Sequence, residues 1–580
     1  MTTQAPPRRS RRGTAVAVVL AAALALVGCA SMPTSGGVVE GTAEVAAPGE
    51  VGFDVQGPAS GADPMQLVQG FVNVAQLGPA STSTFNVARE YVTPAAWNAW
   101  DRASRVLVLS EYPEWEVAAY EEDATTTTVS GEAMVVATLD EAGVYSELPE
   151  PSPVDVSYEL SRDGGEWRMS GLDDGLLVLQ TLFGYAFHRT TLYYPTPDRR
   201  WWVPDVRWYP EQAWRTTASQ QILAGPPPPL VQSAISVVPE GTALAIDAVT
   251  VDDEGVIDVS VTSAITSAPA DDRALLVAQL EETLREGEGR SVELSEGSSP
   301  LAVEAATETP SHPVTLGDAV AVLEGDDGEP ALRRVVGTEL TDLEQPVRLG
   351  DLTPTGVGVG PDDGPVVVRA GDDRLFRLSA DAPPALLLRG DDLLAPSVDR
   401  FGTVWTAVDG RTWVALESGE SFALDVEWLA DAQVRSLRVS PEGARIAVVA
   451  DGADGPEVWV AAVERDADDV PTGLSVPVRV GAPVPSVAAV DWYEETTLVL
   501  LGRNPDGTRS PYLAGIGGLA GSAGGASRAL VTPSGPQALA SGVGASPLLV
   551  LDSGGVLSVR QSSALWPSVA TGVRAAAYPG

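Results

Sequence analysis

The chain has 580 residues, 79 of them acidic and 36 basic, with a formal net charge of −43. A surface this negative repels nucleic acid and anionic lipid headgroups, which excludes a nucleic-acid-binding protein. Every basic residue is arginine, so the chain has no Walker A lysine, no Schiff-base lysine and no Ser-x-x-Lys nucleophile.

The first 28 residues have the layout of an export signal. Arg8, Arg9, Arg11 and Arg12 precede an apolar run of 14 residues, Thr14–Val27. A helix needs roughly 20 apolar residues to cross a bilayer, so this run is too short for a permanent span. We therefore expect residues 1–28 to be a signal peptide that is removed.

The chain has a single cysteine, Cys29, which follows Leu26-Val27-Gly28. This sequence resembles the bacterial lipobox, in which the thiol receives diacylglycerol, the chain is cut before it, and the new amine is acylated. Two or more acyl chains make a stable anchor, at roughly 0.8 kcal/mol per buried methylene. We expect cleavage between Gly28 and Cys29, lipidation of Cys29 (S-diacylglycerol and N-acyl) and a location on the outer face of the cell membrane. The alternative is a buried structural cysteine.

The next segments are a tether and a first folded unit. Residues 29–62 are rich in Gly, Ala, Ser and Pro and predict a flexible tether. Asp63-Pro64 predicts a helix start, with Gln66 at the capping-box position, and Thr93-Pro94 repeats the pattern. Alternating apolar runs follow, with a turn at 163–166. We expect an α+β domain over 63–180, of cystatin or NTF2-like shape.

A second α+β unit is expected over 188–305. Two strands, "TLYYP" and "WWVPDVRWYP", precede a helix, Ala213–Ala224, which ends at Gly225 and four prolines. A hairpin with its turn at 252–255 and a helix over 271–287 come next, and the strand "RSVELS" closes the unit.

From about residue 312 the pattern changes to short strands separated by Gly, Asp and Pro. A strand–turn–strand–turn–strand unit begins near 356, 395, 437, 487 and 536. This repeat predicts a β-propeller over 312–580, of five to seven blades. Because a propeller is a ring, we expect the tail beyond about residue 553, with Leu557, Val559 and Trp566, to pack against the first strands.

These features, in this order, resemble the actinobacterial LpqB lipoprotein family. The matching segments are the lipobox and tether, "DPMQLVQGF" and "EWRMSGLDDGLL", then "ILAGPP", "VVPEGTAL", "GVIDVSV" and "LLVAQLEETL", and last "RVSPEGARIAVV" and "EVWVAAV". The second unit looks like a GerMN domain and the last like a TolB-type propeller. The resemblance implies an accessory lipoprotein that binds the extracytoplasmic domain of a sensor histidine kinase of the Mtr two-component system and tunes its signalling in cell-envelope homeostasis and division.

Candidate chemistry is sparse. The two histidines, His188 and His312, are expected to be isolated surface or linker residues, and a zinc site requires more Cys and His ligands. Ser522, in "AGSAG", lacks the first glycine of a nucleophile elbow and follows both histidines. The Asp-Asp-Gly runs suit hairpin turns, with calcium binding as the alternative. We expect no catalytic residue, no metal site and no cofactor, and hence a protein that is not an enzyme.

One stretch, "TLYYPTPDRRWWVPDVRWYP", concentrates the residue types that anchor interfaces and stack on sugars. The candidate binding surface comprises Tyr193, Arg199, Arg200, Trp201, Trp202, Arg207 and Trp208. The alternative is that alternate members of these strands face the core. We therefore expect a membrane-anchored scaffold that regulates a sensor kinase, and as the alternative a module that binds cell-wall polymer (peptidoglycan or another glycan) through this surface.

Overall fold

The computed structural model describes residue 2 and residues 55–580, except 286–290, 298, 325–327, 346, 363, 454, 519–526 and 533–534. The predicted signal peptide, Gly28, Cys29, most of the tether and Ser522 lie outside the described residues. Residues Val55–Gly580 form one compact unit. No helix in the described ranges is long and apolar enough to cross a membrane.

The first α+β region begins at the predicted helix start. Helix α2 (Pro64–Ala75) has Asp63 as its N-cap: the Asp63 carboxylate accepts from the Gln66 N–H at 2.9 Å, and the Gln66 side chain accepts from the Asp63 N–H at 3.2 Å. This reciprocal capping box satisfies two backbone donors that a helix terminus leaves free. The capped helix presents Leu67, Val68 and Phe71 to the core. The predicted helix start is confirmed.

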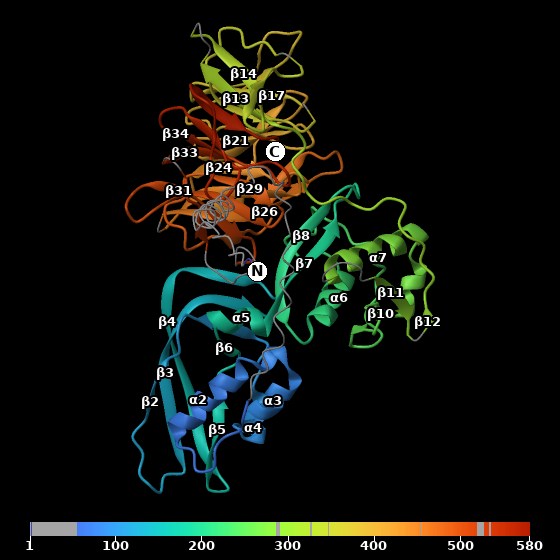
Figure 1. Ribbon diagram of the computed structural model, residues 1–580. Helices are drawn as coiled ribbons and strands as arrows, with labels where there is room; N and C mark the ends of the chain where they lie inside the picture. The colour runs from blue at the N-terminus through green and yellow to red at the C-terminus, as the bar shows by residue number, and fades with distance from the viewer. Residues whose placement is uncertain are drawn as a thin grey trace. The chain divides into compact units, whose positions relative to one another are not determined.

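Two further helices and a curved sheet complete this region (Figure 1). The sheet has the order β5-β4-β3-β1-β6, with β2 paired to β3, and only the β1–β6 pair is parallel. The elements are η1 (Gly78–Ala80), α3 (Thr82–Arg89), α4 (Pro94–Ala99), β1 (Arg105–Leu109), β2 (Glu114–Val117), β3 (Thr126–Asp140), β4 (Tyr145–Asp163), β5 (Glu166–Leu172) and β6 (Leu176–Leu179). The helices and the sheet share one apolar core, as α+β packing requires.

The second α+β region is built on a two-stranded ribbon, β7 (Phe187–Pro195) and β8 (Trp202–Pro210), which follows helix α5 (Gln180–Ala186). Helix α6 (Trp214–Ala224) ends at Gly225, whose φ of 91° is accessible to glycine. A sheet of order β12-β11-β10-β9 and helix α7 complete the region. Their bounds are β9 (Thr250–Val251), β10 (Ile257–Val261), η2 (Ser263–Ser267), α7 (Ala270–Leu284), β11 (Val292–Glu296) and β12 (Ser299–Pro300). The predicted helices and the hairpin are confirmed.

The rest of the described chain forms six sheets of four strands, one of which has a fifth strand, β28. Blade 1 contains β13 (Ala319–Glu324), β14 (Pro330–Val336) and β15 (Glu339–Thr341). Blade 2 contains β16 (Pro354–Val359), β17 (Val366–Ala370), β18 (Arg374–Leu378) and β19 (Ala385–Arg389). Blade 3 contains β20 (Ser397–Val398), β21 (Val404–Val408), β22 (Arg411–Ala415) and β23 (Ser421–Ala423). Blade 4 contains β24 (Val434–Val439), β25 (Arg445–Gly452), β26 (Gly455–Arg465), β27 (Pro471–Leu474) and β28 (Val478–Val480). Blade 5 contains β29 (Val490–Glu494), β30 (Thr497–Arg503), β31 (Arg509–Gly515) and β32 (Arg528–Ala529). Blade 6 contains β33 (Pro536–Ala540), β34 (Leu549–Asp552), β35 (Leu557–Val559) and β36 (Ser568–Ala570). A short η3 (Glu427–Leu429) precedes blade 4.

The ring is closed by the last strand of the chain. Strand β37 (Val573–Ala577) pairs antiparallel with β13, so that Val320 lies opposite Ala577 and Ala321 opposite Ala576. The first blade therefore has the order β15-β14-β13-β37 and combines both ends of the propeller sequence. The predicted packing of the tail against the first strands is confirmed: besides β37, Leu557 and Val559 of blade 6 share a core cluster with Ala319 and Ala321 of β13. Trp566 packs elsewhere, against the cluster that contains Leu539 and Leu548.

Candidate functional site

The aromatic ribbon β7–β8 is buried between other parts of the compact unit. Five of the seven predicted binding residues are at most 8% exposed: Tyr193, Trp201, Trp202, Arg207 and Trp208. Arg199 and Arg200 are exposed. The apolar core of α6 and α7 includes Tyr194 and Trp202 of the ribbon and continues to Ala444 and Ala462 of the propeller. The aromatic faces that would stack on a sugar are therefore covered in this structure.

Trp208 joins three parts of the chain. Its ring packs in the first core against Tyr145 and Phe183, with ring centroids 6.0 and 5.0 Å away, respectively. Its indole N–H donates to the Gly517 carbonyl, in the loop after β31, at 2.9 Å. Gly517 and Gly518 both have positive φ, and a Cβ added at Gly518 would lie 2.1 Å from the Tyr145 ring. Glycine is required here by this close approach.

A second link connects the ribbon, helix α7 and the propeller through charged groups. The Tyr193 hydroxyl donates to Glu495 Oε1 at 2.5 Å. His312 Nδ1 lies 3.0 Å from Glu495 Oε2, and His312 Nε2 lies 2.9 Å from Glu282 Oε1. Hydrogen bonds to Glu282 and Glu495 raise the pKa of His312 to about 10, so the imidazole is protonated at neutral pH. We call Tyr193, Glu282, His312 and Glu495 the His312 clamp.

The clamp corrects the expectation that His312 is an isolated linker residue. It lies in the connection to the propeller, but it carries two ion pairs and is not available as a general base at neutral pH. Burial acts against the charged form of Glu495, yet hydrogen bonds from His312 and Tyr193 lower its pKa. His188, in turn, stacks on Trp214 with centroids 4.0 Å apart and contacts Glu211.

Buried ion pairs lie on both sides of the seam between the ribbon and the propeller. Arg207 Nε donates to Asp205 at 2.8 Å, and burial raises the pKa of Asp205 despite this partner. Arg445 Nε donates to Glu442 at 2.6 Å, and its guanidinium lies over the Trp492 ring at 4.6 Å. Removing one member of such a pair would leave a buried charge without a partner, which is strongly destabilising. These groups are therefore committed to structure.

Among the residues that the structure describes, no group of three or more His, Cys, Asp or Glu side chains is arranged to hold a metal ion. Gly517 and Gly518, in the loop after β31, lie against Val206 and Tyr145, respectively. Sequence reasoning missed Glu282, Glu495 and Gly518, because an acidic residue or a glycine pair has the same local pattern whether it faces solvent or another domain.

Comparisons with known proteins follow the same three regions. Family models match residues 57–184 (lipoprotein LpqB, N-terminal domain), 191–302 (sporulation and spore germination, Germane) and 330–579 (lipoprotein LpqB beta-propeller domain). The chain is 26% identical over 523 residues to lipoprotein LpqB of Bifidobacterium longum, covering 86% of this chain and 87% of the relative. It is 25% identical over 603 residues to that of Cutibacterium acnes, covering 98% and 99%. Among solved structures, a putative TolB from Agrobacterium tumefaciens has a TM-score of 0.29 at 9% identity, over 45% of this chain and 93% of that one.

Proposed function

The chain belongs to the LpqB lipoprotein family. We propose that it is anchored by lipid to the outer face of the cell membrane. There it binds and regulates the extracytoplasmic domain of a two-component sensor kinase of the Mtr type. Its role is then in cell-envelope homeostasis and division. The observation that carries the proposal is the seam: Trp208 and the His312 clamp use the polar and aromatic groups of the ribbon to hold the propeller on the α+β regions. A scaffold needs such fixed surfaces, whereas an enzyme needs polar groups that remain free.

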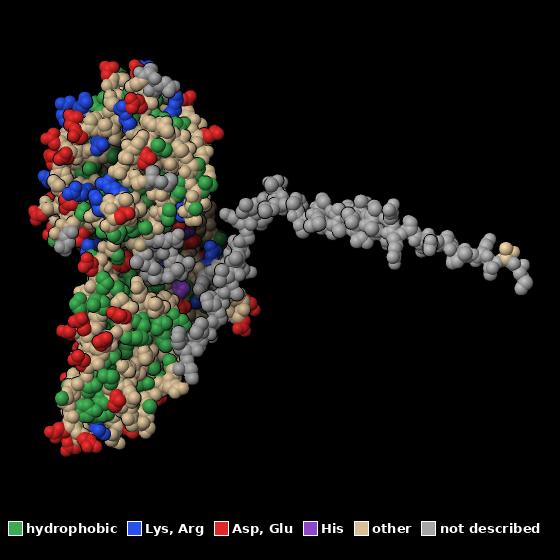
Figure 2. Space-filling view, turned by 60° about the vertical axis from the view of Figure 1, so that its left-hand side comes forward, with side chains coloured by type: hydrophobic (Ala, Val, Ile, Leu, Met, Phe, Trp, Pro, Cys, Tyr) green, Lys and Arg blue, Asp and Glu red, His purple; other side chains and the backbone are tan. Residues whose placement is uncertain are grey.

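The charge distribution favours attachment to the membrane by a covalent lipid over attachment by the surface of the folded protein. On the face seen in Figure 2, arginines gather on the propeller in the upper part, and the lower α+β part shows mainly acidic and apolar side chains. Acidic groups are repelled by anionic lipid headgroups. A covalent anchor at Cys29 would overcome this repulsion, and the tether would keep the folded part away from the bilayer.

The anchor is tested by Cys29→Ser. We expect the variant to remain uncleaved before residue 29 and to take up no fatty-acid analogue, because the alkylated thiol is missing. Ser31→Ala, two residues away, is the matched control and should be processed and labelled normally. Normal maturation and labelling of Cys29→Ser would show that Cys29 is not the lipidation site.

The partner is tested with the full-length lipoprotein and a lipoprotein that ends at residue 305. We expect the full-length protein to co-purify with the sensor kinase from its own membranes and to restore downstream signalling in cells that lack it. The shorter protein should be anchored but should not restore signalling, because it lacks the propeller. Full restoration of signalling by the shorter protein would show that the α+β regions contain the kinase contact. Failure of the full-length protein to capture any sensor kinase would reject the proposal.

We also propose that the chain is not an enzyme. The two histidines are engaged by Glu211, Glu282 and Glu495, which supports a structural role for both. Purified protein should hydrolyse neither ester nor peptide substrates, and an activity that disappears in Ser522→Ala would contradict this.

A further inference from the structure

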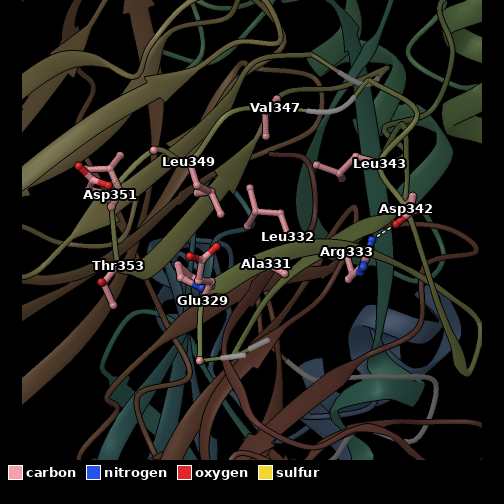
Figure 3. A pocket seen from close by; sticks show the side chains of 14 residues that line it. Glu329, Ala331, Leu332, Arg333, Asp342, Leu343, Val347, Leu349, Asp351 and Thr353 are labelled. Atoms are coloured by element: carbon pink, nitrogen blue, oxygen red, sulfur yellow. Dashed lines mark ion pairs between the residues drawn. The ribbon is translucent and has the colours of Figure 1, made fainter. Parts of the chain in front are cut away.

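The propeller has a groove of about 720 Å³ beside its first blade, lined by both charged and aliphatic residues. Its walls are the start of β14 and, from the connection between β15 and β16, residues 342, 343, 347 and 349–353. The side chains of Leu332, Leu343, Val347 and Leu349 point toward one another across the hollow (Figure 3). The groove therefore has an aliphatic floor that comes from two separate segments.

The apolar residues of this connection are only partly explained by the core. Leu343, Val347, Leu349 and Leu352 pack against the cluster of blades 1 and 2, yet all four remain partly exposed. Connections between strands run over the surface and usually carry polar side chains. In this connection four aliphatic residues within ten positions line one hollow, and each keeps part of its surface uncovered.

The rim of the groove is acidic. Asp342 and Asp351 stand at opposite edges, and Glu329 lies on the β14 side (Figure 3). Arg333, the single arginine among the described lining residues, is ion-paired with Asp342. The groove thus combines an apolar floor with a negative edge, and a complementary ligand has an apolar group between positive charges.

We propose that this groove binds an extended segment of a partner protein that inserts one aliphatic side chain between flanking Arg or Lys residues. The inference deepens the proposed function and rests on it in one respect, that the partner is a protein. The aliphatic side chain would cover Leu343, Val347 and Leu349, and the flanking cations would lie near Asp342 and Asp351. The volume is sufficient for a short peptide segment and not only for a single side chain.

The test measures binding of labelled pentapeptides by fluorescence anisotropy. The probe is Arg-Arg-Leu-Arg-Arg, and the matched peptides are Arg-Arg-Ser-Arg-Arg and Glu-Glu-Leu-Glu-Glu, at about 150 mM salt to screen long-range attraction. We expect the leucine peptide to bind about tenfold or more tightly than the serine peptide, because only leucine buries an aliphatic side chain. Equal binding of these two peptides would overturn the proposal, since a chain this acidic attracts any cationic peptide.

Two variants locate the binding. Val347→Trp fills the hollow and should abolish the preference for leucine over serine. Asp351→Arg changes an exposed residue, so its effect does not depend on repacking of the core. It should weaken binding of Arg-Arg-Leu-Arg-Arg about threefold to tenfold and strengthen binding of Glu-Glu-Leu-Glu-Glu. Asp431→Arg, an equal charge change at an exposed residue outside the groove, is the control. If Asp431→Arg has the same effect as Asp351→Arg, the groove is not the site.

Two further outcomes distinguish this proposal from two alternatives, self-association and a partner other than the kinase. If the wild type self-associates in sedimentation and Val347→Trp prevents it while the leucine preference is unchanged, a second copy occupies the groove and the proposal fails. If the peptides behave as expected but Asp351→Arg restores kinase signalling fully, the groove stands and the kinase is not the protein that fills it.

Discussion

At the scale of single residues, groups that look functional in the sequence serve to join parts of the chain. His312 pairs with Glu282 of α7 and Glu495 of the propeller, and Trp208 donates to the backbone of the loop after β31. A buried indole or carboxylate needs a polar partner, and here each partner comes from a distant part of the sequence. The burial of Trp201 and Trp202 has the same origin.

The clamp predicts a pH dependence for His312→Gln. The folded-state pKa of about 10 is above the unfolded value of about 6.5, so the stabilisation is fully present below pH 6.5 and is lost as the pH rises through 10. We expect the variant to have a free energy of unfolding about 1 kcal/mol lower at pH 6, discounted for the partial exposure of the pair, and the difference to vanish near pH 10. Urea unfolding at pH 6, 8 and 10 measures it. Glu308→Gln, an exposed change in the same connection, is the control. A difference that grows toward pH 10 would contradict the clamp.

At the scale of elements, local sequence decides where helices begin and end, and close packing decides which residues are allowed between elements. Asp63 and Gln66 cap α2 through contacts three residues apart. Gly518, in contrast, is required by the Tyr145 ring, which is more than 300 positions away in the sequence. The first kind of constraint is visible in the sequence and the second is not.

Gly518→Ala tests the contact with Tyr145. Both Gly518 and Gly507 have positive φ, 73° and 86°, so alanine is strained at either position by about 1 kcal/mol. At Gly507 an added Cβ meets no atom within 4 Å, whereas at Gly518 it would lie 2.1 Å from the Tyr145 ring. We expect Gly518→Ala to lower the melting temperature clearly more than the control, Gly507→Ala. Equal melting temperatures would mean that the loop does not pack on Tyr145.

At the scale of the whole molecule, the propeller depends on its ends. Each blade is too small to be stable alone, and the first blade has its fourth strand only because β37 pairs with β13. Beyond β37, the Gly580 carbonyl accepts from the Val398 N–H, so the terminal residues also contact blade 3. The stability of the propeller is therefore a property of the closed ring.

Removing residues 573–580 should open this ring. We expect a lower melting temperature and concentration-dependent aggregation, because β13 then exposes the backbone groups that β37 satisfies. Arg574→Ala, which removes only the ion pair with Glu324, should melt like the wild type. Light scattering and thermal melting measure the two effects. A truncated protein that is monomeric and melts normally would show that β37 does not close the ring.

The sequence by itself determined the order of the regions, the capped helices α2 and α4, the end of α6 at Gly225 and the repeat of short strands, because periodicity, caps and turns act over a few residues. The fourth strand of each blade appears only in the structure. It also predicts Cys29 as the lipid anchor, which the described residues do not include. Only the tertiary structure decided that the aromatic ribbon is buried, that His312 bridges two carboxylates, and that Leu343, Val347 and Leu349 line a groove. The physical reason is that burial and pairing depend on which distant segments meet, and in this chain the partners of Trp208, Gly518 and β13 lie hundreds of residues away.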